Sequence, residues 1–212
     1  MENLARSIAN KISKKLGYDD EKTAVIAYGL IGLFQFIIIL CACALIGLVF
    51  GFFWEAMIIF WGAGLLRRVM GGAHSSGFYS CLFISVVCIC ILAYICSLIK
   101  VYSDSFYFLL AYLVIYAAAF VIVYKLAPVE SPNKPIKESK RVRLRKKALM
   151  TLGIFAILTV AQWIINNLCD FKFYISCALT VSVMWQTFLL LPAGKAFVSA
   201  ADRIFNAGKH TK

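Results

Sequence analysis

The residue types best suited to catalysis gather in one short stretch of the chain. Residues 67–81 contain a cysteine and one of the two histidines of the protein, among arginines and glycines. A thiol attacks poorly at neutral pH, but an imidazole beside it can accept its proton and later return one to a leaving amine. The pairing of His74 with Cys81 therefore predicts nucleophilic catalysis by a Cys–His dyad.

The predicted surroundings of Cys81 favour its thiolate form. If a helix begins near Phe78, Cys81 lies in the first turn, where the positive end of the helix dipole stabilises an anion. Arg67 and Arg68 add positive charge. The backbone N–H groups of that first turn lack partners within the helix, so they could also bind an oxyanion.

The spacing of the two residues sets a condition on the backbone. On one continuous helix, positions 74 and 81 would lie about 10 Å apart, which is too far for a hydrogen bond. The helix must therefore break near Gly77, where glycine permits unusual backbone conformations. We expect Glu55 near the opposite face of the membrane, so the predicted site is a dyad without a carboxylate.

Other interpretations of these residues remain open at this stage. His74 could be a polar residue at the membrane interface and Cys81 a packed thiol. The pair could also bind a metal or haem, but a third ligand is missing nearby, so we predict no metal and no cofactor. The other seven cysteines lack zinc-type spacing and are expected to be reduced thiols, with a Cys96–Cys169 bridge left open.

Composition assigns the chain to the membrane. Of its 212 residues 62% are hydrophobic and only 15% are charged, with a net charge of +12. A soluble domain needs more polar surface than that, whereas a bilayer solvates apolar helix faces. The basic residues lie between the apolar segments, which argues against a nucleic-acid partner.

The apolar segments predict an all-α protein with about six membrane-spanning helices. A span needs roughly 20 apolar residues. Two spans are expected between Lys22 and Arg67, hinged near 47–53. The second, near 54–66, is short if it starts at Trp54 and could then be a re-entrant segment instead of a full span. The remaining four are expected from 78 onward and over 105–124, 148–169 and 173–194.

The basic residues predict the orientation. With the N-terminus inside, 20 of the 22 Lys and Arg lie in cytoplasmic segments, and only Lys100 and Lys172 lie outside. Both termini are then cytoplasmic, the Cys81 turn lies near the cytoplasmic face, and the inner surface contacts anionic lipid. The cytoplasmic segments are residues 1–22, 67–68, 125–147 and 195–212.

Two further features complete the expected single domain over residues 1–212. Residues 1–21 form an amphipathic helix on the inner membrane surface, either as an anchor or as a receiver of a partner helix. The loop 125–147 is strongly basic, either as a topology anchor or as a docking surface for an acidic peptide. Its basic half, from Lys137, is expected to begin the fifth helix.

The arrangement of Arg67, Gly72, His74 and Cys81 after the second apolar segment resembles the accessory gene regulator B (AgrB) family. The similarity includes the chain length, the six apolar segments and the loop Ala127-Pro128-Val129-Glu130-Ser131-Pro132-Asn133-Lys134-Pro135-Ile136. It covers essentially the whole chain.

The resemblance implies a bacterial cell-membrane cysteine endopeptidase, whose substrate is an AgrD-like precursor of a cyclic quorum-sensing peptide. It makes Cys81 the nucleophile, His74 the general base and acid, and Arg67 and Gly72 supporting residues of the same turn. Cys81 would form a thioester with the signal segment and release the tail, and an internal thiol or hydroxyl would then close a thiolactone or lactone. The resemblance is also compatible with a homodimer.

The main alternative is a transporter or exporter of small peptides that carries out no proteolysis. Six spans and a basic inner face permit this function. Transport pathways usually contain ionisable residues within the membrane helices, however, and these helices have almost none.

Overall fold

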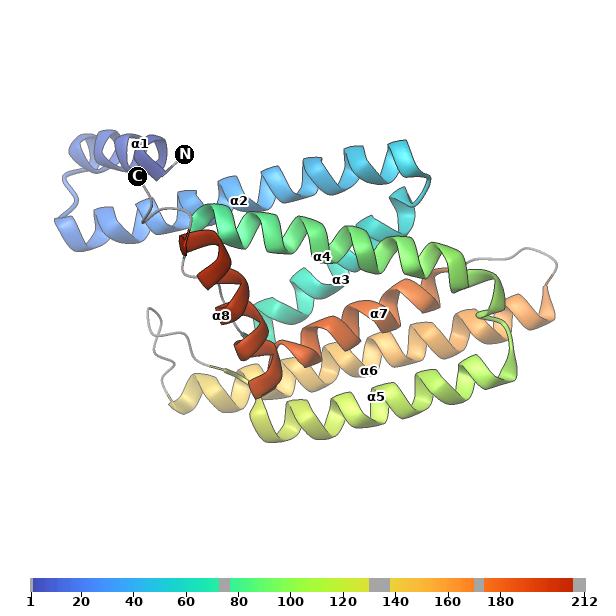
Figure 1. Cartoon of the computed structure of the whole chain (residues 1–212). Coiled ribbons are helices and arrows are strands. Elements are labelled where there is room, and N and C mark those ends of the chain that lie inside the picture. Colours follow the sequence, from blue (N-terminus) through green and yellow to red (C-terminus); the bar gives the residue numbers. More distant parts are fainter. Residues whose placement is uncertain (1, 73–76, 130–137, 170–173, 208–212) are drawn as a thin grey trace.

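The structure, a computed structural model, describes residues 2–72, 77–129, 138–169 and 174–207. The described part is all-α, as predicted, with one isolated bridge between Gly71 and Val129. Its elements, shown in Figure 1, are α1 (Glu2–Leu16), α2 (Asp20–Phe50), α3 (Phe53–Met70), α4 (Phe78–Ile99), the 3-10 turn η1 (Lys100–Tyr102), α5 (Phe106–Leu126), α6 (Glu138–Leu168), α7 (Ile175–Phe188) and α8 (Pro192–Ala207).

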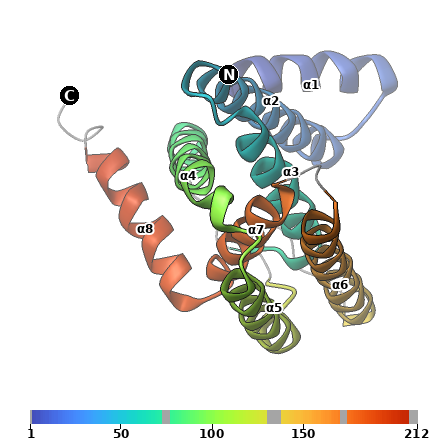
Figure 2. The ribbon, with the colours of Figure 1, turned by 90° about the vertical axis from the view of Figure 1, so that its right-hand side faces the viewer.

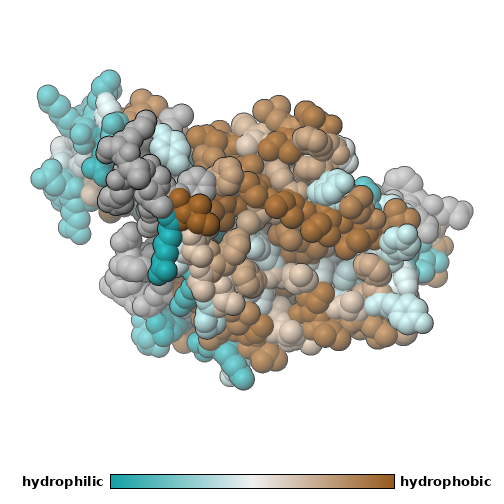
Figure 3. All heavy atoms as spheres, in the orientation of Figure 1, coloured by the Kyte–Doolittle hydropathy of each residue, from teal (hydrophilic) through white to brown (hydrophobic). Residues whose placement is uncertain are grey.

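The length of the helices and their apolar outer surface are those of an all-α membrane protein. Four helices of the described chain are long and apolar enough to cross a bilayer, and the bent pair α7–α8 would make a fifth. Their outward faces carry many exposed large apolar residues, among them Leu48, Ile91, Val114 and Ile157. Figure 3 shows this apolar surface over the middle of the molecule and hydrophilic residues gathered toward one end. The expected number of six spans stays a prediction.

Helix α3 has fewer exposed faces than the four candidate spans. It packs against α2, α4, α6 and α7, and Ile59, Leu66 and Met70 are completely buried. Its sequence contains Glu55, Arg67 and Arg68, which explains why its 18 residues do not qualify as a span by composition. The helix is longer at both ends than the predicted segment near 54–66.

The turn between α2 and α3 lies within the predicted hinge. Gly51 ends α2 in the left-handed conformation, with a φ of 77°, and glycine adopts that conformation without steric cost. At the other end of α2, the Asp19 side chain accepts a hydrogen bond from the backbone N–H of Lys22 at 2.8 Å. This cap satisfies one of the unpaired donors of the first turn.

Helix α7 lies inside the bundle and contacts α3, α4, α5 and α6 (Figure 2). The prediction of one helix over 173–194 is wrong at its C-terminal end, since α7 stops at Phe188. Proline at position 192 disfavours helical conformation at Leu191 and is well suited to begin a new helix. The chain accordingly turns by 82° into α8, which packs beside α4.

The other helix predictions are largely confirmed. Helix α4 begins at Phe78 as expected, and α5 begins one residue after the start of the predicted segment. Helix α6 begins at Glu138, so the basic half of the 125–147 loop does start the fifth expected helix. The amphipathic N-terminal helix is present as α1, which packs against α2. Its predicted end at residue 21 is wrong, since α1 stops at Leu16 and α2 begins at Asp20.

Candidate active site

The helix break predicted between positions 74 and 81 is present. Helix α3 ends at Met70, Gly71 and Gly72 both have positive φ values, and α4 starts after an extended Gly77. His74 itself lies outside the described residues, as does His210. The pairing of His74 with Cys81 therefore stays a prediction.

Gly71 occupies a backbone conformation that no other residue would fit. Its φ is 72°, and a Cβ atom would collide with the carbonyl oxygen of Val129. The backbone N–H of Val129 donates to the Met70 carbonyl at 2.9 Å, which joins this turn to the segment after α5. The glycine therefore lets two distant stretches of backbone meet directly beside the site.

Gln186 of α7 holds the same turn from inside the bundle. Its Nε2 donates a 2.7 Å hydrogen bond to the Gly71 carbonyl oxygen, and its side chain is almost completely buried. Gly72 also lies against this amide, because a Cβ there would be 3.3 Å from Nε2. The predicted role of Gly72 in the turn thus has a structural basis in its contact with α7.

Cys81 is half-buried at the start of α4, where its backbone N–H donates to the Gly77 carbonyl at 3.1 Å. It lines a small cavity of about 30 Å³, which is room for about two water molecules. Helical side chains lean toward the N-terminus of their helix, so the thiol lies over the first turn of α4. The cavity is lined by Arg67, Cys81, Ile84, Ser85, Trp185, Leu189 and Val198.

Arg67 lines the same cavity as Cys81. The structure thus brings Arg67 and Cys81 together, as the sequence predicted. Arg68, the other predicted source of positive charge, is exposed on the next position of α3. Of the two arginines, only Arg67 lines the cavity.

The opposite end of α3 contains the one acidic residue of that helix. Glu55 is buried and forms an ion pair with Lys100 of η1. Glu55 is twelve positions from Arg67, or about 18 Å along the helix. Its carboxylate is therefore far from the Cys81 cavity, and the dyad without a carboxylate stays a prediction.

The remaining cysteines lie in different surroundings. All eight are free, and Cys43, Cys96 and Cys177 are buried within the bundle. Cys96 contacts Cys177, whereas Cys169 is exposed. Among the described residues, no group of three or more His, Cys, Asp or Glu side chains is arranged to hold a metal ion.

Comparison of the sequence with known proteins places the chain in a family. The model for accessory gene regulator B matches residues 5–190. The chain belongs to the AgrB family. Two relatives from Clostridium perfringens are named as putative AgrB-like proteins, and each is 32% identical over 97% of this chain and 98% of its own length. No solved structure matches the chain.

Family membership supports a role in processing the quorum-sensing peptide of an accessory gene regulator system, with an AgrD-like propeptide as substrate. The resemblance drawn from the Arg67–Cys81 turn is thereby confirmed at the level of the family.

Sequence reasoning missed Gln186, Trp185 and Val129 as parts of the site. Gln186 offered a signal, because a lone amide within an otherwise apolar membrane segment usually has a specific partner. Trp185 and Val129 offered none, since both residue types are common in apolar segments. Only the folded chain brings α7 and the segment after α5 to the Cys81 turn.

Proposed function

We propose that this AgrB-family protein is a membrane cysteine endopeptidase in which Cys81 is the nucleophile and His74 the general base and acid. The observation that carries the proposal is the position of Cys81: half-buried in the first turn of α4, on a cavity shared with Arg67. A thiolate there is stabilised by the helix dipole and by the guanidinium.

The first half of the reaction cleaves the precursor. His74 takes the Cys81 proton, and the sulfur attacks the carbonyl carbon of the scissile peptide bond. The N–H groups of Phe78 and Tyr79 have no acceptor within their helix and are suited to stabilise the oxyanion. The C–N bond then breaks, the leaving amine takes its proton from His74, and a thioester to Cys81 remains.

The second half closes the ring. A thiol or hydroxyl within the acyl segment loses its proton to His74 and attacks the thioester carbonyl. The Cys81–acyl bond breaks and the thiolate is restored, which yields a thiolactone or lactone. Apolar surroundings reduce the access of water to the thioester and so favour cyclisation over hydrolysis.

The charge distribution supports a cytoplasmic site. Arg67, Arg68, Lys125 and the basic start of α6 belong to the same end of the bundle, while Lys100 lies at the other end with Glu55 (Figure 1). The positive-inside rule puts the basic end in the cytoplasm, together with both termini. A newly made precursor would meet the enzyme there, and the basic residues would attract an acidic segment.

The test is co-expression with the short precursor peptide encoded beside the gene, followed by mass spectrometry of the peptide products. Cleavage should disappear in Cys81→Ala and in His74→Ala while membrane levels stay normal. Cys88→Ala, on the same helix and also half-buried, is the matched control and should process normally. Cleavage that persists in Cys81→Ala would refute the proposal and favour peptide transport without proteolysis.

A further inference from the structure

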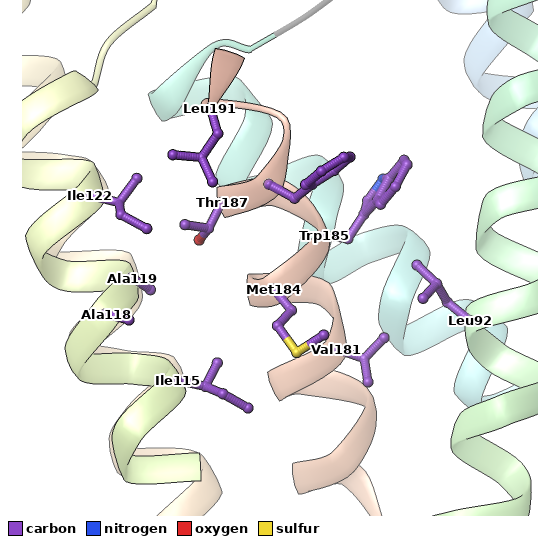
Figure 4. A pocket seen from close by; sticks show the side chains of 11 residues that line it. Leu92, Ile115, Ala118, Ala119, Ile122, Val181, Met184, Trp185, Thr187 and Leu191 are labelled. Atoms are coloured by element: carbon purple, nitrogen blue, oxygen red, sulfur yellow. The ribbon is translucent and has the colours of Figure 1, made fainter. Parts of the chain in front are cut away.

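An apolar groove of about 460 Å³ lies between α4 and α5, with α7 as its floor (Figure 4). Helix α4 contributes Leu92, α5 contributes Ile115, Ala118 and Ile122, and α7 contributes Met184 among others. The groove opens on the apolar flank of the bundle, since Ala118 and Met184 are exposed. Its lining fits apolar side chains.

One polar group interrupts this lining. Thr187 is 7% exposed and lines the groove, and its Oγ1 has no hydrogen-bond partner within the described part of the chain. Hydroxyls in helices usually donate to a carbonyl one turn earlier. Thr180 and Ser182 of the same helix do so, at 2.8 and 2.7 Å.

Figure 4 shows the Thr187 side chain between α7 and α5, in the space that the groove occupies. A buried hydroxyl without a partner is costly, and a ligand with a backbone carbonyl or N–H group would satisfy it. The groove therefore offers one hydrogen-bonding position within an apolar channel, as a peptide with apolar side chains requires.

The groove adjoins the Cys81 cavity across a single side chain. Trp185 lines both spaces. The Trp185 ring packs against the rings of Phe188 and Phe197, with centroid distances of 5.8 and 6.1 Å. These contacts hold the indole between the groove and the Cys81 cavity. A chain seated in the groove would reach the thiol by passing Trp185.

We propose that this groove binds the apolar side chains of the precursor on the acyl side of the scissile bond, with Thr187 hydrogen-bonded to the peptide backbone. The inference rests on the proposed function of Cys81. The acyl segment stays attached to Cys81 as a thioester until the ring closes, so it is the part that needs a binding site beside the thiol. The other candidate occupants are a lipid acyl chain and a second copy of this protein.

Photo-crosslinking tests the occupant directly. p-Benzoyl-phenylalanine replaces Ile122, which lines the groove, or Val121, which is exposed beside it and serves as the control. Both are made in the Cys81→Ala protein, so that co-expressed precursor is not consumed. We expect the precursor to crosslink at position 122, through residues N-terminal to the scissile bond, and not at position 121.

Crosslinks from position 122 only to lipid or to a second copy would overturn the inference, as would equal capture at both positions. Cys81-dependent cleavage is measured in parallel on the protein without the photo-label. If cleavage depends on Cys81 but position 122 captures no precursor, this inference alone is overturned. If cleavage continues without Cys81, the proposed function itself is refuted.

Steric filling of the groove gives a second test. Ala118→Trp should raise the KM for the precursor at least about tenfold, because the indole occupies the groove, while Ala117→Trp on the outer face of α5 should leave it within about twofold. Thr187→Val keeps the shape and should raise KM about fivefold. Alkylation of Cys81 by a small soluble reagent should stay unchanged in Ala118→Trp. Equal KM values for the two Trp variants would contradict the inference.

Discussion

The two ends of α3 hold their charged residues in opposite ways. At one end, the buried Glu55 pairs with Lys100, and the charge is satisfied within the bundle. At the other end, Arg67 faces a cavity that contains a thiol. The Arg67 end thus has a small cavity beside a potential nucleophile, whereas the Glu55 end holds an ion pair.

The backbone differs between the two ends as well. Beyond Arg67 the chain leaves the helix through Gly71, which is held by Gln186 and by the segment at Val129. The turn at Gly71 is therefore held by contacts from two distant parts of the sequence, α7 and the segment after α5. We infer that the Glu55 end of α3 serves stability and that the Arg67 end serves catalysis. Substitutions at the two ends should therefore affect different properties, the free energy of unfolding and the rate of cleavage.

Among substitutions outside the predicted Cys81–His74 dyad, the largest effect on processing is expected from Gly71→Ala. The new Cβ would collide with the Val129 carbonyl at a φ of 72°, so the turn must shift. We expect the rate of precursor cleavage to fall at least about 100-fold, since small displacements of catalytic groups are costly. Peptide products are quantified by mass spectrometry at equal membrane levels.

Gly64→Ala is the matched control for this change. It lies on α3, which leads to the Gly71 turn, and a Cβ there would meet no atom within 4 Å. Alanine favours helix over glycine, so this variant should process normally and be slightly more stable. A comparable loss of activity in both variants would show that a change in α3, and not the strained turn at Gly71, causes the loss.

Lys100→Met probes the other end of α3. The substitution leaves Glu55 buried without its counter-charge, and we expect the free energy of unfolding to fall by about 2 kcal/mol, less than for a fully buried pair. Unfolding is followed in detergent micelles. The double variant Glu55→Gln/Lys100→Met should recover most of the loss.

Processing per folded molecule should change by less than about twofold in Lys100→Met, because the ion pair at Glu55 lies about 18 Å along α3 from Arg67. A folded Lys100→Met protein without activity would contradict the assignment of this ion pair to stability.

Gln186→Leu should have a smaller effect on processing than Gly71→Ala. It removes the hydrogen bond to the Gly71 carbonyl but keeps a side chain of similar size in the core. One such bond is worth about 1 kcal/mol, so kcat should fall about fivefold with KM nearly unchanged. Ser182→Ala, which removes a local bond in the same helix, is the control. Equal kcat values in the two variants would argue against a positioning role for Gln186.

Arg145→Lys should slow processing less than Gln186→Leu does. The Arg145 Nε donates to the Ala127 carbonyl at 2.8 Å, and its guanidinium lies over the Tyr124 ring, so it supports the segment that leads to Val129. Lysine keeps the charge but loses the planar donor, and we expect cleavage to slow about threefold. An effect as large as that of Gly71→Ala would mean that this segment itself contacts the substrate.

Much of the fold followed from the apolar segments alone. The starts of α4 and α5 were predicted within one residue, because Gly77 and Ser105 separate long apolar runs from polar turns. The end of α7 was not, since the apolar run continues past Phe188 and only the proline at position 192 indicates the bend. Hydropathy reports what surrounds a segment and not the direction of its axis.

The candidate site was predictable in part for a similar reason. Arg67, Gly72 and Cys81 are close together in sequence, so a local pattern could identify them, and the helix break that they require is present. Gln186 and Val129 lie 115 and 58 residues from Gly71 in the sequence. Their contacts with Gly71 depend on how α7 and the end of α5 pack. No local spacing rule contains that information.

The central claim is that Cys81 carries the acyl group of the precursor. Intact-mass and peptide mass spectrometry of the enzyme, incubated with a precursor whose internal nucleophile is replaced by alanine, tests it most directly. We predict a hydroxylamine-labile adduct on the peptide containing Cys81, equal in mass to the precursor fragment N-terminal to the cleaved bond. Cleavage without an adduct on Cys81, or an adduct on another cysteine that persists in Cys81→Ala, would show that Cys81 is not the nucleophile.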